Sequence, residues 1–144
     1  MPRILVLNGP NLGRLGSREP DVYGNQDLPA LKRLLEAETT TEIDLRQTDD
    51  EATLIGWLHE AVDTLSPVIL NPAAFTHYSY ALRDAAALVT KAGIPLIEVH
   101  ISNPHAREEF RHTSVISAIA TGVIAGFGFD SYLLALSAIL RRQS

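Results

Sequence analysis

Short apolar segments alternate with longer amphipathic segments along this chain of 144 residues. The apolar segments have the composition of buried strands, and the segments between them repeat their apolar residues with the period of an α-helix. Strands that alternate with helices form a parallel sheet covered on both faces. We therefore predict a single α/β domain, residues 1–144, built on a doubly wound five-stranded parallel sheet. Its expected strands lie at residues 4–7, 43–45, 68–70, 96–99 and 123–124.

The helical segments are bounded by residues that favour helix ends. Asp27 is suited to cap the first helix, and the acidic run at residues 49–51 suits the beginning of the second. The third helix is expected at about residues 80–91, and the last at about residues 130–142, where two arginines favour the C-terminal end of the helix dipole.

Polar side chains follow the third and fourth predicted strands. Asn71 ends the third strand and His77 comes soon after it, whereas His100 and Ser102 follow the fourth. A doubly wound sheet binds its ligand beyond the carboxyl ends of its strands, so we expect these side chains at one rim. A histidine there suits acid–base chemistry, and the backbone amides after it suit an anion. The alternative is a structural histidine at a strand end.

The stretch from residue 7 to residue 24 is far longer than an ordinary connection between a strand and a helix. The spacing of its glycines matches neither the dinucleotide fingerprint nor the P-loop, which disfavours a nucleotide cradle. Residues 13–24 are instead a candidate lid. Tyr23, within it, acts as a general base only as tyrosinate, a form that a nearby arginine such as Arg18 would stabilise. The alternative is that Tyr23 packs the loop and the arginines are solvated.

Three further charged side chains are candidates for ligand contacts. Arg107 and Arg111 belong to a charged segment after the fourth strand, and they either meet an anion or a hydroxyl at the rim or form a solvated turn. Asp84 lies seven residues after His77. It either orients a polar ligand or is an ordinary surface carboxylate.

The composition disfavours several classes of protein. The chain contains no cysteine, which excludes disulfides, thiolate metal sites and cysteine nucleophiles within it. Its histidines include no closely spaced pair on one helix, so we expect no metal site. The net charge of -5 disfavours nucleic-acid binding. We expect no membrane span and no signal peptide, and hence a cytoplasmic protein, because the apolar runs are short.

Several separated motifs resemble those of the type II 3-dehydroquinate dehydratases. The match continues through residues 120–128 and 132–136 and thus extends over essentially the whole chain. The main motifs are NGPNLGRLGSREPDVYG at residues 8–24, VILNPAAFTHYS at 68–79, ALRDA at 81–85 and IEVHISNPHAREEFRH at 97–112.

This resemblance implies a flavodoxin-like fold and a hydro-lyase of the shikimate pathway of aromatic amino acid biosynthesis. The implied reaction is the anti elimination of water from 3-dehydroquinate to 3-dehydroshikimate through an enolate, with no metal or organic cofactor. The implied assembly is a homo-oligomer, a dodecamer built as a tetramer of trimers.

The resemblance also implies four catalytic roles. Tyr23 would remove the C2 proton, and Arg18 would hold it as tyrosinate. Asn11 would fix a water near the enolate oxygen, and His100 would protonate the departing C1 hydroxyl. This set fits the chemistry, since a weakly acidic proton beside a ketone requires a strong base, an enolate stabiliser and an acid for the poor leaving group.

The remaining residues implied by the resemblance bind the substrate. Its carboxylate would lie on the backbone at Ile101 and Ser102. Arg107 would be a second arginine near Tyr23, and Asp84 would reach in from a neighbouring subunit. The residues implied for the ring hydroxyls are Asn71, His77 and Arg111.

Three positions depart from the family pattern. Tyr78 stands where the family commonly has Thr, Asp49 where Asn is usual, and Ser131 where Gly is common. None is one of the catalytic positions above. The departures therefore concern pocket shape, subunit contacts and affinity more than the type of reaction.

Two other classes of protein fit the sequence poorly. A dehydratase with a Schiff-base lysine on an eight-fold barrel needs about 250 residues, and the lysines here, Lys32 and Lys91, lie in predicted helices. A receiver module would carry acidic residues at the strand ends where Asn8 and Asn71 stand.

Overall fold

The computed structural model describes residues 3–16 and 26–143. In this part of the chain a five-stranded, all-parallel sheet has the strand order β2-β1-β3-β4-β5. The predicted parallel sheet is thus confirmed, and each strand extends beyond its apolar run by at most two residues at either end. The strands are β1 (Arg3–Asn8), β2 (Glu42–Gln47), β3 (Val68–Asn71), β4 (Leu96–His100) and β5 (Gly122–Ala125).

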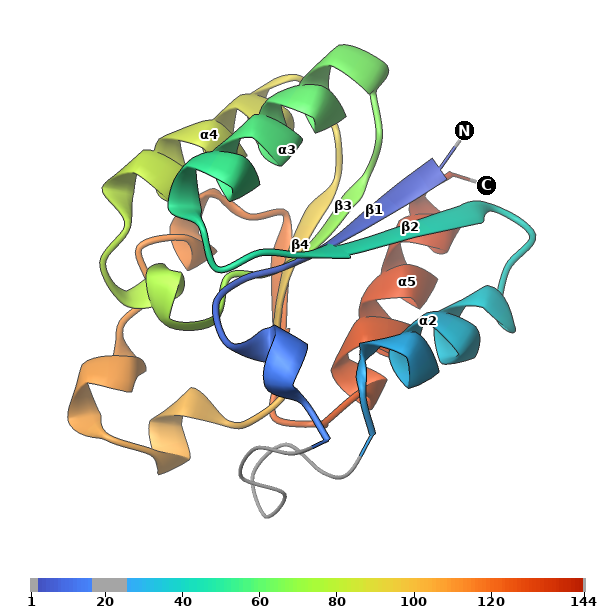
Figure 1. Ribbon diagram of the computed structural model, residues 1–144. Helices are drawn as coiled ribbons and strands as arrows, with labels where there is room; N and C mark the ends of the chain where they lie inside the picture. The colour runs from blue at the N-terminus through green and yellow to red at the C-terminus, as the bar shows by residue number, and fades with distance from the viewer. Residues whose placement is uncertain (1–2, 17–25, 144) are drawn as a thin grey trace.

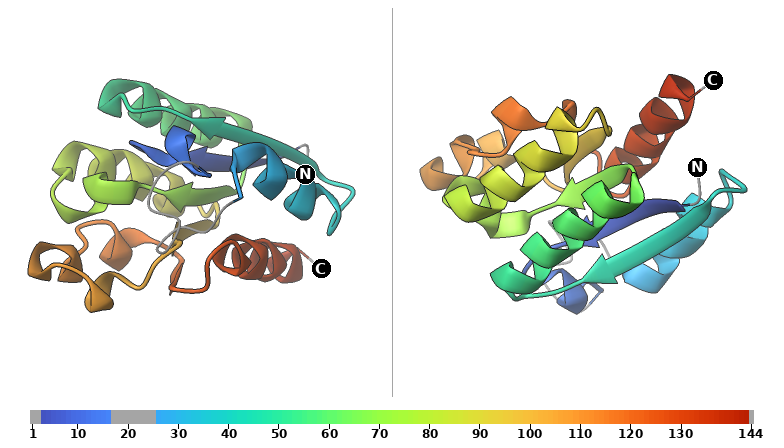
Figure 2. Two further views of the ribbon diagram at one scale, coloured as in Figure 1. Left: turned by 60° about the horizontal axis from the view of Figure 1, so that its bottom comes forward. Right: turned by 90° about the horizontal axis from the view of Figure 1, so that it is seen from above.

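Four α-helices cover the two faces of the sheet in the described residues. Helices α2 (Leu28–Glu36) and α5 (Asp130–Arg142) lie on one face, and α3 (Glu51–Thr64) and α4 (Tyr80–Lys91) lie on the other (Figure 1). The view from above in Figure 2 shows α3 and α4 in front of the strands. The predicted bounds of α4 and α5 are confirmed. No helix in the described residues has both the length and the apolar character needed to cross a membrane.

Side-chain caps set the beginnings of three of these helices. The Asp27 carboxylate accepts a hydrogen bond from the Ala30 amide at 3.0 Å, as predicted for α2. The acidic run before α3 contributes Asp50, which accepts from the Thr53 amide at 3.2 Å. Such caps satisfy amides that have no partner within the helix.

Two apolar cores lie on either side of the sheet because successive strand side chains point to opposite faces. In β1, Ile4 and Val6 pack toward α2 and α5, whereas Leu5 and Leu7 pack toward α3 and α4. The same alternation continues to the strand ends. It directs Asn8 and its register partner Asn71 to the side of α2 and α5.

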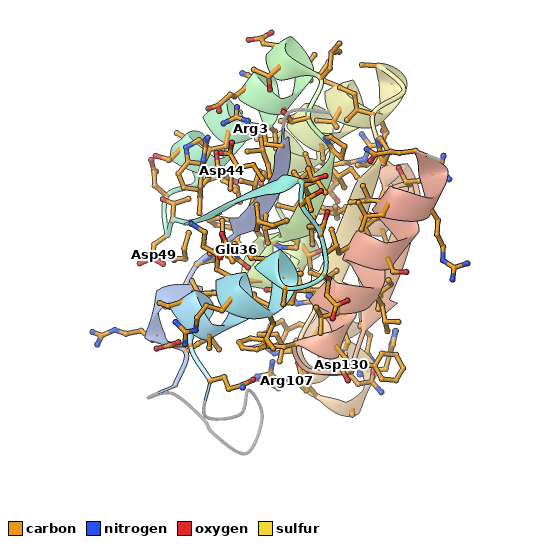
Figure 3. All side chains as sticks on the ribbon, turned by 90° about the vertical axis from the view of Figure 1, so that its right-hand side faces the viewer. Arg3, Glu36, Asp44, Asp49, Arg107 and Asp130 are labelled. Atoms are coloured by element: carbon orange, nitrogen blue, oxygen red, sulfur yellow. The ribbon has the colours of Figure 1, made fainter. Side chains whose placement is uncertain are left out.

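Charged side chains cover the outer edge of the sheet at strand β2. Arg46 is paired with Asp44 at 2.8 Å and with Glu60 of α3 at 2.7 Å, and Arg3 contacts the same two carboxylates. Figure 3 shows Arg3 beside Asp44. Hydrogen bonds from Arg46 and Arg3 outweigh the cost of desolvation and lower the pKa of Glu60 to about 2. Charges on an edge strand also disfavour its pairing with another chain.

Candidate active site

A polar cavity of about 100 Å³ lies beyond the carboxyl ends of β1, β3 and β4. Its walls come from the segment after β1, from η2 (Ala73–His77), and from the segment between β4 and η4 (Glu109–His112). Figure 3 shows Arg107, one of its residues, at the opposite end of the molecule from Arg3. The predicted site residues that line it are Asn11, Asn71, His77, His100, Ile101, Ser102, Arg107 and Arg111.

The other three predicted site residues are not among the described residues that line this cavity. Arg18 and Tyr23 lie outside the described residues, as does most of the expected lid at 13–24. Asp84 lies on α4 with an exposed carboxylate, 3.0 Å from Arg83 Nη1, and does not line the cavity.

A larger hollow of about 600 Å³ lies over α5. Leucines and Phe127 form most of its lining, together with Glu38, Asp130, Ser137 and Arg141. Its described lining brings together no histidine and no set of acid and base groups of the kind found beyond the strand ends. The smaller polar cavity is therefore the candidate active site.

His100 is held by a buried carboxylate from its own strand. Its Nε2 lies 2.5 Å from Oε2 of Glu98, which is 0% exposed. Because an ionised carboxylate only accepts hydrogen bonds, Nε2 carries the proton of this contact. His100 Nδ1 is then the ring nitrogen that is available for chemistry in the cavity.

Three hydroxyl groups surround the same carboxylate. Thr76 and Ser117 donate to Glu98 at 2.6 Å, and Ser114 donates at 3.2 Å. Burial alone would raise the pKa of Glu98, but the hydrogen bonds and the charge of His100 outweigh it, and the net shift is downward. Glu98 is therefore a carboxylate at neutral pH and accepts the Nε2 proton of His100.

His77 faces the cavity as a neutral ring with a defined tautomer. Its Nδ1 lies 2.8 Å from the carbonyl oxygen of Thr113, so Nδ1 must donate. Burial lowers the pKa of His77, and the positive charges of Arg111 and His100 add to this effect against the opposing hydrogen bond to Thr113. Nε2 of the neutral ring is an acceptor, which suits a ligand hydroxyl.

The segment that carries Asn11 is fixed by contacts with neighbouring strands. Asn11 has a left-handed backbone with φ of 70°, and its amide donates to the Asp49 carboxylate at 2.8 Å. Gly9 donates from its amide to the carbonyl oxygen of Asn71 at 2.8 Å. A Cβ at Gly9 would lie 2.7 Å from the Pro72 carbonyl oxygen, so this close approach requires glycine.

Two arginines give the mouth of the cavity its positive charge. Arg107 Nη1 lies 3.4 Å from Ser102 Oγ, and Arg111 Nε lies 3.1 Å from Glu108 Oε1. Both guanidinium groups stay charged at any working pH. They suit an anionic or hydroxyl-rich ligand.

Glu98 is the site residue that our sequence analysis did not single out. It interrupts an otherwise apolar strand two positions before His100. Residues two apart in a strand share a face, so this spacing was the available signal. Two of the three departures from the family pattern do not line the cavity: Ser131 is buried and accepts from the Phe127 amide at 3.1 Å, and the Tyr78 side chain is exposed. The third, Asp49, is the residue that accepts from the Asn11 amide.

Comparison with known proteins gives consistent matches over nearly the whole chain. The model of the class II dehydroquinase family matches residues 2–140. The chain is 57% identical over 143 residues to a 3-dehydroquinate dehydratase of Salinispora tropica, covering 97% of this chain and 98% of that protein. It is 60% identical over 136 residues to one of Mycobacteroides abscessus, covering 92% of each.

Solved structures agree with the sequence matches. A type II dehydroquinase from Propionibacterium acnes superposes with a TM-score of 0.92 at 50% identity, covering 98% of this chain and 97% of the other. One from Butyrivibrio crossotus gives a TM-score of 0.90 at 41% identity, covering 96% and 97%. A family model that matches nearly the whole chain, relatives of similar length and a shared fold together show that this protein belongs to the class II dehydroquinases.

Proposed function

We propose that the chain dehydrates 3-dehydroquinate to 3-dehydroshikimate, as a hydro-lyase of the shikimate pathway, in the cavity beyond the strand ends. Its membership of the class II dehydroquinases, whose relatives carry the name of this activity, supports the reaction. One observation supports the assignment of the reaction to this cavity: a histidine paired with a buried carboxylate lies there together with two arginines. His100 on Glu98 supplies the pair, and Arg107 and Arg111 line the same cavity.

His100 is the general acid in this proposal. Hydroxide is a poor leaving group, so the C1 hydroxyl must receive a proton as its bond to carbon breaks. Glu98 holds Nε2 and so orients the ring, and Nδ1 delivers the proton. A neutral water then leaves.

In this proposal Tyr23 is the base and Arg18 stabilises it as tyrosinate. Both lie outside the described residues, so their roles rest on the family resemblance. Forming tyrosinate at pH 7 costs about 4 kcal/mol for an unperturbed phenol. Arg18, with Arg107 as the second arginine, reduces this cost by stabilising the anion. Asn11 fixes a water that stabilises the enolate oxygen after the C2 proton is removed.

The remaining cavity residues bind the substrate. Its carboxylate rests on the backbone amides at Ile101 and Ser102, and its ring hydroxyls contact Asn71, His77 and Arg111. The neutral tautomer of His77 supports this role, because its Nε2 accepts an O–H hydrogen bond.

Asp84 completes the site of a neighbouring subunit in the proposed assembly, a dodecamer of four trimers. Its exposed position on α4, away from the cavity of its own chain, is consistent with this role.

Ultraviolet absorbance of the conjugated enone acid tests the activity. Purified protein mixed with 3-dehydroquinate should generate this absorbance equally with and without borohydride, since no lysine imine forms. His100→Asn should abolish most of the rate, whereas the same change at the exposed His59 of α3 should leave it unchanged. A folded protein that produces no enone, or a His100→Asn variant with full activity, would refute the proposal.

A further inference from the structure

A buried chain of hydrogen bonds joins the ends of β1 and β3 next to the cavity. The Tyr132 hydroxyl of α5 donates to Asn8 Oδ1 at 2.7 Å and accepts from Asn71 Nδ2 at 2.8 Å. Tyr132 and Asn8 are each 0% exposed, and Asn71 is 3% exposed. The two asparagines are register partners in adjacent strands, so one phenol reaches both.

The donor and acceptor roles in this row of hydrogen bonds are determined at Asn8, the end away from the cavity. Asn8 Nδ2 donates to the Arg46 carbonyl oxygen at 3.0 Å, which turns Asn8 Oδ1 toward Tyr132 as an acceptor. The phenol has a single proton and gives it to Asn8, so its oxygen can only accept from Asn71.

Two further features maintain these donor and acceptor roles. Burial raises the pKa of Tyr132 far above neutrality, so the phenol keeps its proton. At the end next to the cavity, Asn71 Oδ1 accepts from the Ala73 amide at 3.0 Å. A flipped Asn71 amide would set its oxygen against the phenol oxygen, with no proton between them, and its nitrogen against an N–H donor.

We infer that Tyr132 is a positioning residue that fixes the amide orientation of Asn71, so that Asn71 offers its second N–H to a hydroxyl of the substrate. Asn71 lines the cavity, whereas Tyr132 and Asn8 do not. The inference rests on the proposed role of Asn71 in substrate binding. It predicts the polarity of this contact: Asn71 donates and the substrate oxygen accepts. His77, with an acceptor at Nε2, provides the opposite polarity.

The first test is the substitution Tyr132→Phe, which removes one oxygen and leaves the ring in the core. Asn71 then loses the acceptor that sets its orientation, and the KM for 3-dehydroquinate should rise about tenfold, as expected for a misdirected hydrogen bond. The kcat should change less than twofold, because the acid and base are untouched. Tyr80→Phe, which removes the hydroxyl of an exposed tyrosine on α4, is the matched control.

A double-mutant cycle distinguishes positioning from a general loss of stability. If Tyr132 acts through Asn71, Tyr132→Phe should leave KM unchanged in an Asn71→Ala background. Full additivity of the two changes in KM, or an unchanged KM in Tyr132→Phe alone, would overturn the inference. If Asn71→Ala itself binds substrate normally, the proposed role of Asn71 fails instead.

Asn8→Ala approaches the same amide from the other end and serves if Tyr132→Phe does not fold. Without the Asn8 oxygen, the O–H bond of Tyr132 can rotate toward Asn71. It then donates to the Asn71 oxygen and favours the flipped amide. The same rise in KM is expected, and again no further rise when Asn71 is alanine. Additive effects in this second cycle would equally contradict the inference.

Discussion

Replacing Glu98 by Gln tests how much of catalysis depends on the buried carboxylate behind His100. The change keeps the size of the side chain but removes the negative charge that lies 2.5 Å from His100 Nε2. A hydrogen bond to a charged group contributes about 1.5–3 kcal/mol. Where the whole of that interaction supports proton delivery by His100, its loss lowers kcat about 10- to 150-fold. KM should stay near the wild-type value, since Glu98 is 0% exposed.

The assay is the initial rate of enone formation across a range of substrate concentrations and pH. Thermal unfolding should accompany it, because Thr76, Ser114 and Ser117 lose a charged acceptor. Glu109→Gln, at an exposed carboxylate in η4, is the matched control. A folded Glu98→Gln enzyme with kcat within threefold of wild type would show that the carboxylate does not support the acid step.

Three other perturbations have defined outcomes. Glu60→Gln should reduce the free energy of unfolding by about 1 kcal/mol at pH 7, the range for a partly exposed ion pair. Because the folded pKa of Glu60 is lowered to about 2 from an ordinary 4.5, that contribution is complete above about pH 5. The difference from wild type should therefore shrink as the pH falls toward 2, and a difference that grows in acid would contradict the ion-pair explanation. Asp49→Ala should lower kcat/KM severalfold by freeing the Asn11 amide, while Asp49→Asn, which keeps an acceptor oxygen, should restore most of it; equal losses in both variants would show that the acceptor is irrelevant. Gly9→Ala should lower Tm by several degrees, since its Cβ would lie 2.7 Å from the Pro72 carbonyl oxygen, and an unchanged Tm would mean that the backbone shifts freely.

Local signals were sufficient to predict the strands and the α-helices of the fold. The helix bounds followed from caps such as Asp27 and from the 3.6-residue period, and the strands followed from short apolar runs. The rim residues were predictable because parallel strands direct the residues that follow them to one edge of the sheet. This rule brought Asn71, His77 and His100 to one cavity. Their individual roles, and those of Tyr23 and Arg18, remain predictions.

The supporting contacts of the site depend on the tertiary structure and could not be predicted in the same way. Tyr132 and Asn8 are 124 residues apart, and nothing in the helical pattern of α5 distinguishes this tyrosine from an apolar core residue. The hydroxyls around Glu98 come from segments up to 22 residues away, including the short turn at η2. Such short 3₁₀ helices serve as connectors, and the poor geometry of their own hydrogen bonds keeps them brief.

Because side chains alternate along the strands, the contacts that support Asn71 and those that support His100 lie on opposite faces of the sheet. Asn71 is anchored through Tyr132 in the layer of α2 and α5, whereas His100 is anchored through Glu98, which contacts Thr76 and Ser114 on the opposite face. The support of Asn71 and the support of His100 therefore lie in separate cores. Variation in the layer of α2 and α5 can tune the contact of Asn71 with the substrate while the support of the acid stays intact.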